Sequence, residues 1–234
     1  MNTFSLALAE SLAMVGRLDP KLVEIVALSL QVSLASIALS ALVALPLGAA
    51  VAVASFPGRR AIVVVLNALL GLPAVVVGLA VYLLLSRAGP LGSLGILFTP
   101  SAMVAAQAIL VFPLLAALTR QVVADGYEET REQLTSLGAS TWTSAIALLV
   151  DARYTLVTIV LAGFGRAISE VGAVMIVGGN IDGVTRVMTT AIALETSKGD
   201  LPLALGLGLV LLAIVLALNV AASLVKESVQ RRHG

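Results

Sequence analysis

The sequence contains no cysteine, one histidine and few charged or aromatic side chains. The lack of cysteine excludes disulfide frameworks and thiolate metal sites, and the terminal His233 leaves no imidazole cluster for a metal and no serine–histidine pair. Charged residues make up 12% of the chain, whereas soluble domains carry roughly 25%. So few charges cannot cover a globular surface in water, which excludes a soluble fold.

Two further absences limit the functions that the chain can have. There is no G-x-x-x-x-G-K-[ST] phosphate loop, so the chain is not expected to hydrolyse a nucleotide itself. The net charge is +1, and the basic residues form only short loop clusters, which gives no electrostatic footprint for nucleic acid. We therefore predict no catalytic residues, no metal site and no cofactor within this chain.

Long apolar stretches dominate what is present. The mean hydropathy is +1.08, and a spanning helix needs about 20 mostly apolar residues. We predict an all-α integral membrane protein with five transmembrane helices. Gly71-Leu72-Pro73 interrupts the second stretch, and Pro46 and Pro113 favour kinks in the first and third. The stretches cover residues 22–54, 61–85, 100–118, 154–177 and 201–225.

The domain boundaries follow from these stretches. Residues 1–21 form an N-terminal segment, in which residues 4–18 have the apolar spacing of a short interfacial helix, with a frayed terminus as the alternative. Residues 22–225 form the transmembrane domain, including a cytoplasmic loop at 120–153, and residues 226–234 form a cytoplasmic tail. The early charges Glu10 and Arg17 argue against a cleavable signal peptide.

The distribution of lysine and arginine predicts the orientation. Cytoplasmic loops carry an excess of these residues, and one set of alternate loops holds eight of them against five in the other set. The N-terminus is then outside and the C-terminus cytoplasmic. In the outer loop after the fourth crossing, residues 186–196 predict a short helix. The cytoplasmic set is Arg59, Arg60, Arg120, Arg131, Arg153, Lys226, Arg231 and Arg232, and the outer set is Arg17, Lys21, Arg87, Arg186 and Lys198.

Residues 127–142, which we call the acidic elbow, concentrate charge in the cytoplasmic loop. Strong helix formers run up to Leu137, Gly138 suits a C′ position with positive φ, and Ser140 or Thr141 suits the cap of a second helix. The pattern predicts two short helices joined at the glycine. Their acidic side chains suit docking on a basic groove of a partner, and an ordinary solvated loop is the alternative. The carboxylates are Glu128, Glu129 and Glu132.

Two motifs resemble those of a known family. Glu132-Gln133-Leu134, followed after three residues by Gly138, resembles the E-A-A-x-x-x-G pattern of bacterial ATP-binding-cassette (ABC) import permeases. Both alanines of that pattern are replaced here, and Asp151 stands where many members have a proline after the second helix. Residues 163–173 and 177–181 resemble the G-R-A-x-x-E-x-G-A … V-G-G-N-I run of molybdate, sulfate and tungstate permeases. Residues 89–92, 168–173 and 185–192 are most similar to the tungstate type.

The resemblance implies a type I ABC importer permease fold and a subunit that carries an oxyanion across the cytoplasmic membrane. Tungstate is the expected anion, with molybdate or sulfate as alternatives. The implied partners are a second copy of the chain, a cytoplasmic ATPase that binds the ATP, and an extracytoplasmic oxyanion-binding protein. Glu128, Glu129, Glu132 and Gly138 would form the loop that couples to the ATPase. A stand-alone channel or secondary carrier is the competing class, and it would need no acidic elbow.

Arg166 and Glu170 place opposite charges near the middle of the fourth crossing. Because they are four residues apart, they share one face of the predicted helix. Charges at this depth are costly and usually functional. Two interpretations stay open: a buried strut that fixes helix packing, or a pair that lines or gates the translocation path. An anion on that path needs hydrogen-bond donors, which Arg166, Ser169 and the threonines 155 and 158 can supply.

Overall fold

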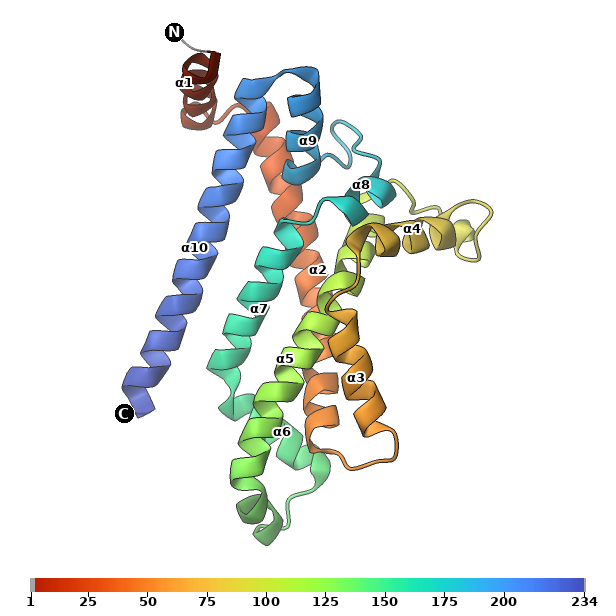
Figure 1. Ribbon diagram of the computed structural model, residues 1–234, viewed down its shortest axis with the longest axis vertical. Helices are drawn as coiled ribbons and strands as arrows, with labels where there is room; N and C mark the ends of the chain where they lie inside the picture. The colour runs from red at the N-terminus through yellow and green to blue at the C-terminus, as the bar shows by residue number, and fades with distance from the viewer. Residues whose placement is uncertain (1–2, 234) are drawn as a thin grey trace. The chain divides into compact units, whose positions relative to one another are not determined.

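The structure is a computed structural model that describes the backbone of residues 3–233 and the side chains of residues 5–225. This part of the chain is helical throughout and contains no β-strand (Figure 1). The helices are α1 Thr3–Gly16, α2 Pro20–Val53, α3 Arg59–Leu69, α4 Ala74–Leu85, the 3₁₀ turn η1 Gly92–Leu94, α5 Pro100–Ser136, α6 Thr141–Asp151, α7 Arg153–Ile168, α8 Gly172–Gly178, α9 Met188–Lys198 and α10 Leu201–His233.

Three helices, α2, α5 and α10, are each long and apolar enough to cross a membrane. Two interrupted pairs, α3 with α4 and α6 with α7, also qualify when each pair is taken as one span, which gives up to five. The break between α3 and α4 falls at the predicted Gly71-Leu72-Pro73. The axes of α6 and α7 differ by 74°. The chain is thus a multi-pass membrane protein.

The chain divides into two compact units, which we describe separately. Unit 1 comprises Met1–Ser36, Pro73–Gln107 and Gly165–Ala217. Unit 2 comprises Ile37–Leu72, Ala108–Phe164 and Leu218–Gly234. Each unit therefore collects segments that are far apart in the sequence.

Small residues and buried polar side chains hold unit 1 together. Helices α4 and α8 lie side by side (Figure 1), and a Cβ on Gly78 would lie 2.7 Å from Cα of Ala173, so only glycine permits this approach. The buried Gln107 connects three segments: its Oε1 accepts from Ser36 Oγ at 3.0 Å, and its Nε2 donates to Ala167 O at 3.0 Å. Such hydrogen bonds suit a membrane interior, where water cannot satisfy the same groups.

Unit 2 is built on a close contact between α2 and α5. A Cβ on Gly48 would lie 2.7 Å from Ala116 O, so these two backbones touch without an intervening side chain. Arg59, the first residue of α3, donates from Nε to Val51 O and from Nη2 to Ala52 O, each at 2.7 Å. It thereby satisfies carbonyls that the end of α2 leaves free. The α2–α3 turn is fixed by this one side chain.

Several predicted elements are confirmed. Helix α1 covers the predicted N-terminal segment and α9 the predicted outer helix, although the interfacial position of α1 stays a prediction. Asp200 accepts a hydrogen bond from Leu203 N at 3.3 Å at the start of α10, as expected of an N-cap. Residues 226–233 continue α10, but the side chains of the predicted tail, residues 226–234, lie outside the described residues.

Two predictions about helix ends were wrong. The third stretch does not end near residue 118, because α5 continues to Ser136 and includes the first helix of the acidic elbow. The fourth stretch is not one continuous helix: α7 ends at Ile168 and α8 begins at Gly172. Gln107 Nε2 bonds to Ala167 O, and Thr189 Oγ1 bonds to Glu170 O at 2.7 Å, so side chains replace the helical partners at this break.

Candidate functional site

The acidic elbow turns sharply at Gly138, as predicted. Gly138 has φ 70°, its N–H donates to Thr135 O at 3.0 Å, and the N–H of Ala139 donates to Leu134 O at 2.9 Å. These two bonds form the Schellman motif that ends a helix at glycine. Ser140 then caps α6 by accepting from Thr143 N at 3.1 Å. The hydrogen bonds of the turn are therefore satisfied within the elbow itself.

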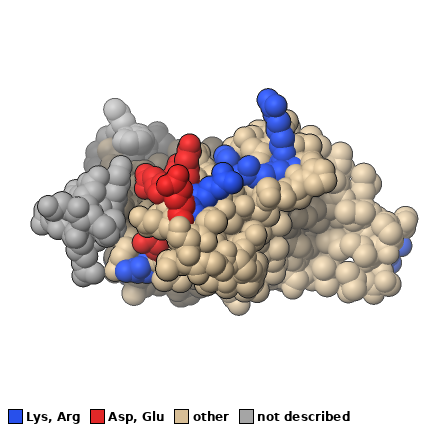
Figure 2. Space-filling model, turned by 90° about the horizontal axis from the view of Figure 1, so that it is seen from below, with Lys and Arg blue, Asp and Glu red and all other residues tan. Residues whose placement is uncertain are grey.

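The surface of the elbow combines carboxylates with large apolar groups. Glu128, Glu129 and Glu132 are exposed, and they line a groove of about 590 Å³ together with Arg59 and Arg131. No ion pair involves these carboxylates among the side chains that the structure describes. Figure 2 shows acidic side chains gathered beside basic ones on this face. The elbow's charges are thus available to a partner.

Two apolar residues at the elbow were not predicted from the sequence. Leu137 is 82% exposed and Trp142 61% exposed, although both are large apolar side chains. Trp142 is the only tryptophan of the chain, and tryptophan is enriched among residues that dominate binding energy at protein interfaces. Its place directly after a glycine turn was the available sequence signal. Exposed apolar side chains beside free carboxylates are typical of a docking surface.

A small core connects the elbow to the end of α2. Buried residues of α2, α5 and α6 pack into one cluster, against which Tyr127 and Leu134 of the elbow also pack. A displacement of the elbow must therefore move α2 or break this packing, because close-packed interiors transmit strain. The buried members are Ala49, Ala52, Val53, Val123, Ala145 and Leu148.

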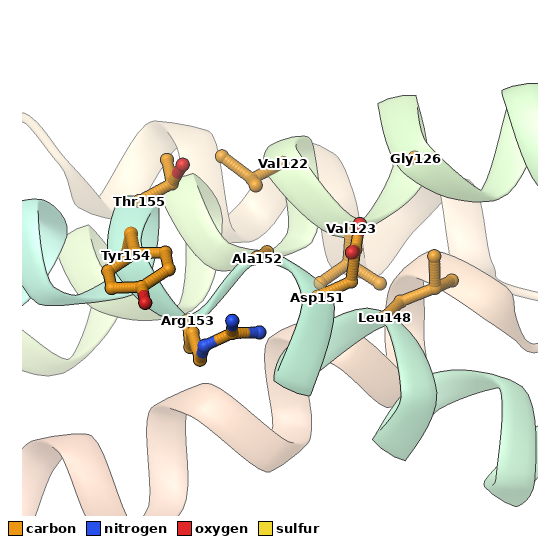
Figure 3. A pocket seen from close by; sticks show the side chains of 9 residues that line it. All are labelled: Val122, Val123, Gly126, Leu148, Asp151, Ala152, Arg153, Tyr154 and Thr155. Carbon is orange, nitrogen blue, oxygen red and sulfur yellow. The ribbon is translucent and has the colours of Figure 1, made fainter. Parts of the chain in front are cut away.

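The α6–α7 bend encloses a pocket of about 290 Å³ (Figure 3). Arg153 Nη1 donates to Val150 O at 2.9 Å, and its guanidinium lies 4.6 Å from the ring centroid of Tyr154. Asp151 and the exposed Thr155 line the same pocket, whereas Thr158 Oγ1 donates to Tyr154 O at 3.3 Å within its own helix. These contacts help to fix the bend between α6 and α7.

In unit 1, Arg166 and Glu170 form the ion pair that their spacing predicts. Arg166 Nη1 lies 2.7 Å from Glu170 Oε2, and the side chains are 45% and 5% exposed. Glu170 lies beyond the end of α7, however, so the two do not share a continuous helix. Its Oε1 accepts from Ala173 N at 3.4 Å in the first turn of α8. The carboxylate thus joins the two helix ends, while the guanidinium stays half exposed.

Ser169 lies in the break beside this pair, and its side chain is exposed. The half-exposed guanidinium and this hydroxyl together provide hydrogen-bond donors of the kind an oxyanion requires. Gln107 positions the break through Ala167 O, and it was missed from the sequence. A single amide within the apolar run of residues 101–118 was the signal that could have found it.

A second buried charge cluster in unit 1 was also missed. Arg186, only 8% exposed, lies 2.7 Å from Asp182 and 3.7 Å from Glu195, and Lys198 lies 3.1 Å from Glu195. Glu195 is 3% exposed. From the sequence, residues 186–196 predicted only a short helix. The charged residues are separated in the sequence by a turn and by most of α9, so periodicity gave no signal for their contact.

The described residues contain no group of three or more His, Cys, Asp or Glu side chains arranged to hold a metal ion. The arrangement consists instead of an apolar multi-pass bundle, an exposed acidic elbow in one unit and buried ion pairs in the other. These features are those of a multi-pass membrane protein with an exposed, charged turn between two of its helices.

No protein-family model matches the chain. Three curated proteins are similar over most of it. It is 42% identical to the "Probable anion ABC transporter permease protein" of Haloferax volcanii, over 91% of this chain and 94% of that protein. It is 46% identical to the tungstate uptake system permease protein TupB of Peptoclostridium acidaminophilum, over 86% and 88%, and 38% identical to TupB of Campylobacter jejuni, over 70% and 69%. More distant relatives are named for molybdenum and sulfate transport. The chain belongs to the permease proteins of ABC transporters.

Proposed function

We propose that this chain is the permease subunit of an ABC importer that carries tungstate across the cytoplasmic membrane. The observation that supports the substrate is the similarity to two tungstate uptake permeases at 46% and 38% identity. The motifs around Arg166 and Glu170 support the same assignment, because they resemble those of tungstate-type permeases. We further propose that α3–α4 and α6–α7 each count as one crossing, which gives five spans, a type I importer fold, an outer N-terminus and a cytoplasmic C-terminus; the helix lengths support five spans.

The acidic elbow is the surface that we assign to the ATPase. Its carboxylates Glu128, Glu129 and Glu132 are exposed and unpaired within the described chain, and Gly138 sets the direction of the turn. Tyr127 and Leu134 pack on the small core that includes the end of α2. Movement of the ATPase would be transmitted to α2 through this packing. ATP is bound by that partner and no cofactor by this chain.

The remaining partners complete the transporter. A single set of five spans makes only half of an enclosed path, so two copies related by a twofold axis are expected to form it. An extracytoplasmic binding protein selects the oxyanion and delivers it. Arg166, Ser169 and Glu170 are the candidates for the path or its gate, where weak and sequential hydrogen bonding allows the anion to leave again.

The test is uptake by proteoliposomes that contain the permease, its co-purifying ATPase and the binding protein. Tungstate, molybdate and sulfate are supplied separately, and the internal anion is measured by mass spectrometry with and without ATP. The proposal predicts ATP-dependent accumulation with tungstate preferred. Preference for molybdate or sulfate would support the alternative substrates, and accumulation independent of ATP would instead support a channel or secondary carrier.

A further inference from the structure

A basic pocket lies at the turn between α2 and α3, and Ser55 and Arg59 line both this pocket and the groove of the acidic elbow. Its volume is about 560 Å³. Arg59, Arg60 and Arg120 line it together with Ser55, Phe56 and Val63, and no carboxylate of the described chain lines it. All of these residues belong to unit 2. The pocket is therefore lined by both cationic and apolar side chains.

The positive charge in this pocket is not neutralised within the described chain. Arg120 is partly buried in α5 and forms no ion pair with any described carboxylate. Arg59 donates to two backbone carbonyls of α2, which fixes the guanidinium in place but leaves its charge. A partly buried charge on an apolar helix is costly unless it meets an opposite charge or the aqueous interface. The pocket thus favours a bound anion.

The backbone around the pocket adds to this preference. Helix α3 begins at Arg59, and its N-cap residue, Gly58, has φ 92° and offers no side-chain cap. The first N–H groups of a helix carry partial positive charge. An anion held by the arginines would therefore also face the uncapped start of α3.

The outer surface of α3 is apolar directly beyond the arginines. Ile62 is 40% exposed, Val64 61% and Val65 54%. Because the turn connects two apolar segments, it lies where the hydrocarbon meets the headgroups. An amphiphile with a negative head and hydrocarbon chains matches this arrangement, since the head would meet the arginines and the chains would follow α3. A free oxyanion would contact only the polar side chains that line the pocket.

We propose that the pocket of Arg59, Arg60 and Arg120 binds the phosphodiester headgroup of an anionic phospholipid such as phosphatidylglycerol. Arginine suits phosphate because its planar donors match the phosphate oxygens. Basic pockets between spanning helices are a recognised means of holding anionic lipid heads. The bound lipid would neutralise Arg120 and brace the α2–α3 turn.

Native mass spectrometry of the purified full-length chain tests this proposal, with phosphatidylglycerol and phosphatidylcholine titrated separately. The variants are Arg60→Gln and Arg120→Gln. Arg59 is left intact because it also closes α2. The control is Arg153→Gln, which removes an exposed arginine of the same unit outside the pocket. We expect the wild type to retain phosphatidylglycerol in preference to phosphatidylcholine, with about fivefold weaker retention for each pocket variant and no change for the control.

Three results would overturn the proposal. The first is equal retention of the two lipids by the wild type, which needs no variant and so does not depend on the variants folding. The second is a loss of retention in Arg153→Gln as large as in the pocket variants. The third is displacement of the lipid by an equimolar amount of inorganic phosphate or tungstate, which would identify a site for a free oxyanion.

Discussion

The two units of this permease use charge in opposite ways. In unit 1, Arg186 and the carboxylates Glu170 and Glu195 are at least nine-tenths buried, and each belongs to an ion pair. In unit 2, Glu128, Glu129 and Glu132 are exposed and unpaired within the described chain. Charges of the first kind hold the protein's own segments together, whereas charges of the second kind are available to other molecules. Substitutions should therefore affect stability in unit 1 and association in unit 2.

The largest loss of stability is expected from Arg186→Met. Among the described side chains, this change leaves the buried Glu195 with Lys198 as its one ion-pair partner, and breaking a buried ion pair costs about 3 kcal/mol or more. Thermal unfolding of the purified protein in detergent measures the loss. Lys198→Met is the matched control, because Lys198 is 50% exposed and such a pair contributes at most about 1 kcal/mol. Equal effects of the two substitutions would remove the distinction between buried and exposed charge within unit 1.

A smaller loss is expected from Arg166→Ala, about 2 kcal/mol, because Glu170 stays buried while the arginine it loses is half exposed. The double variant Arg166→Ala/Glu170→Gln should recover part of the stability, since no buried charge is then unpaired. Thermal unfolding together with tungstate uptake distinguishes the two interpretations of the pair. A strut requires uptake to recover with stability in the double variant. A path residue requires uptake to stay low, and full stability of Arg166→Ala alone would contradict the strut.

In unit 2, Gly138→Ala should cost about 1 kcal/mol, because the backbone there has positive φ, which residues with a Cβ disfavour. Thermal unfolding measures this cost, and Gly165→Ala is the control, since Gly165 is helical and a Cβ there meets no atom within 4 Å. If Gly138→Ala were as stable as the wild type, the closed Schellman turn would not define the elbow.

Much of the fold followed from local patterns in the sequence. Apolar length predicted the long helices, and Gly71-Leu72-Pro73, Gly138 and Ser140 predicted where chain segments break or begin, because each acts through its own backbone or its nearest neighbours. The break after Ile168 was not predictable in this way. It depends on Gln107 and Thr189, which reach the carbonyls of residues 167 and 170 from other parts of the sequence.

The candidate sites likewise divide into those that local sequence patterns predicted and those that they did not. The Arg166–Glu170 pair was predicted because four residues separate its members, and the acidic elbow because its charges are consecutive. The Arg186 cluster and the basic pocket at Arg120 were not predicted. Their members come from separate segments that only the fold brings together, and no single-sequence period connects residues 59 and 120.

The proposal that the acidic elbow docks the ATPase is tested most directly by neutralising the elbow carboxylates. The amount of ATPase that co-purifies with the permease is then measured. In the triple variant Glu128→Gln/Glu129→Gln/Glu132→Gln, the account predicts about tenfold weaker co-purification of the ATPase, from roughly 0.5 kcal/mol for each exposed charge. ATP-dependent tungstate uptake should fall in parallel, while the thermal stability of the variant stays unchanged. The control is Glu10→Gln, which removes an exposed carboxylate of unit 1 and should behave as the wild type. Undiminished retention of the ATPase by the triple variant would contradict the assignment of the acidic elbow as the docking surface.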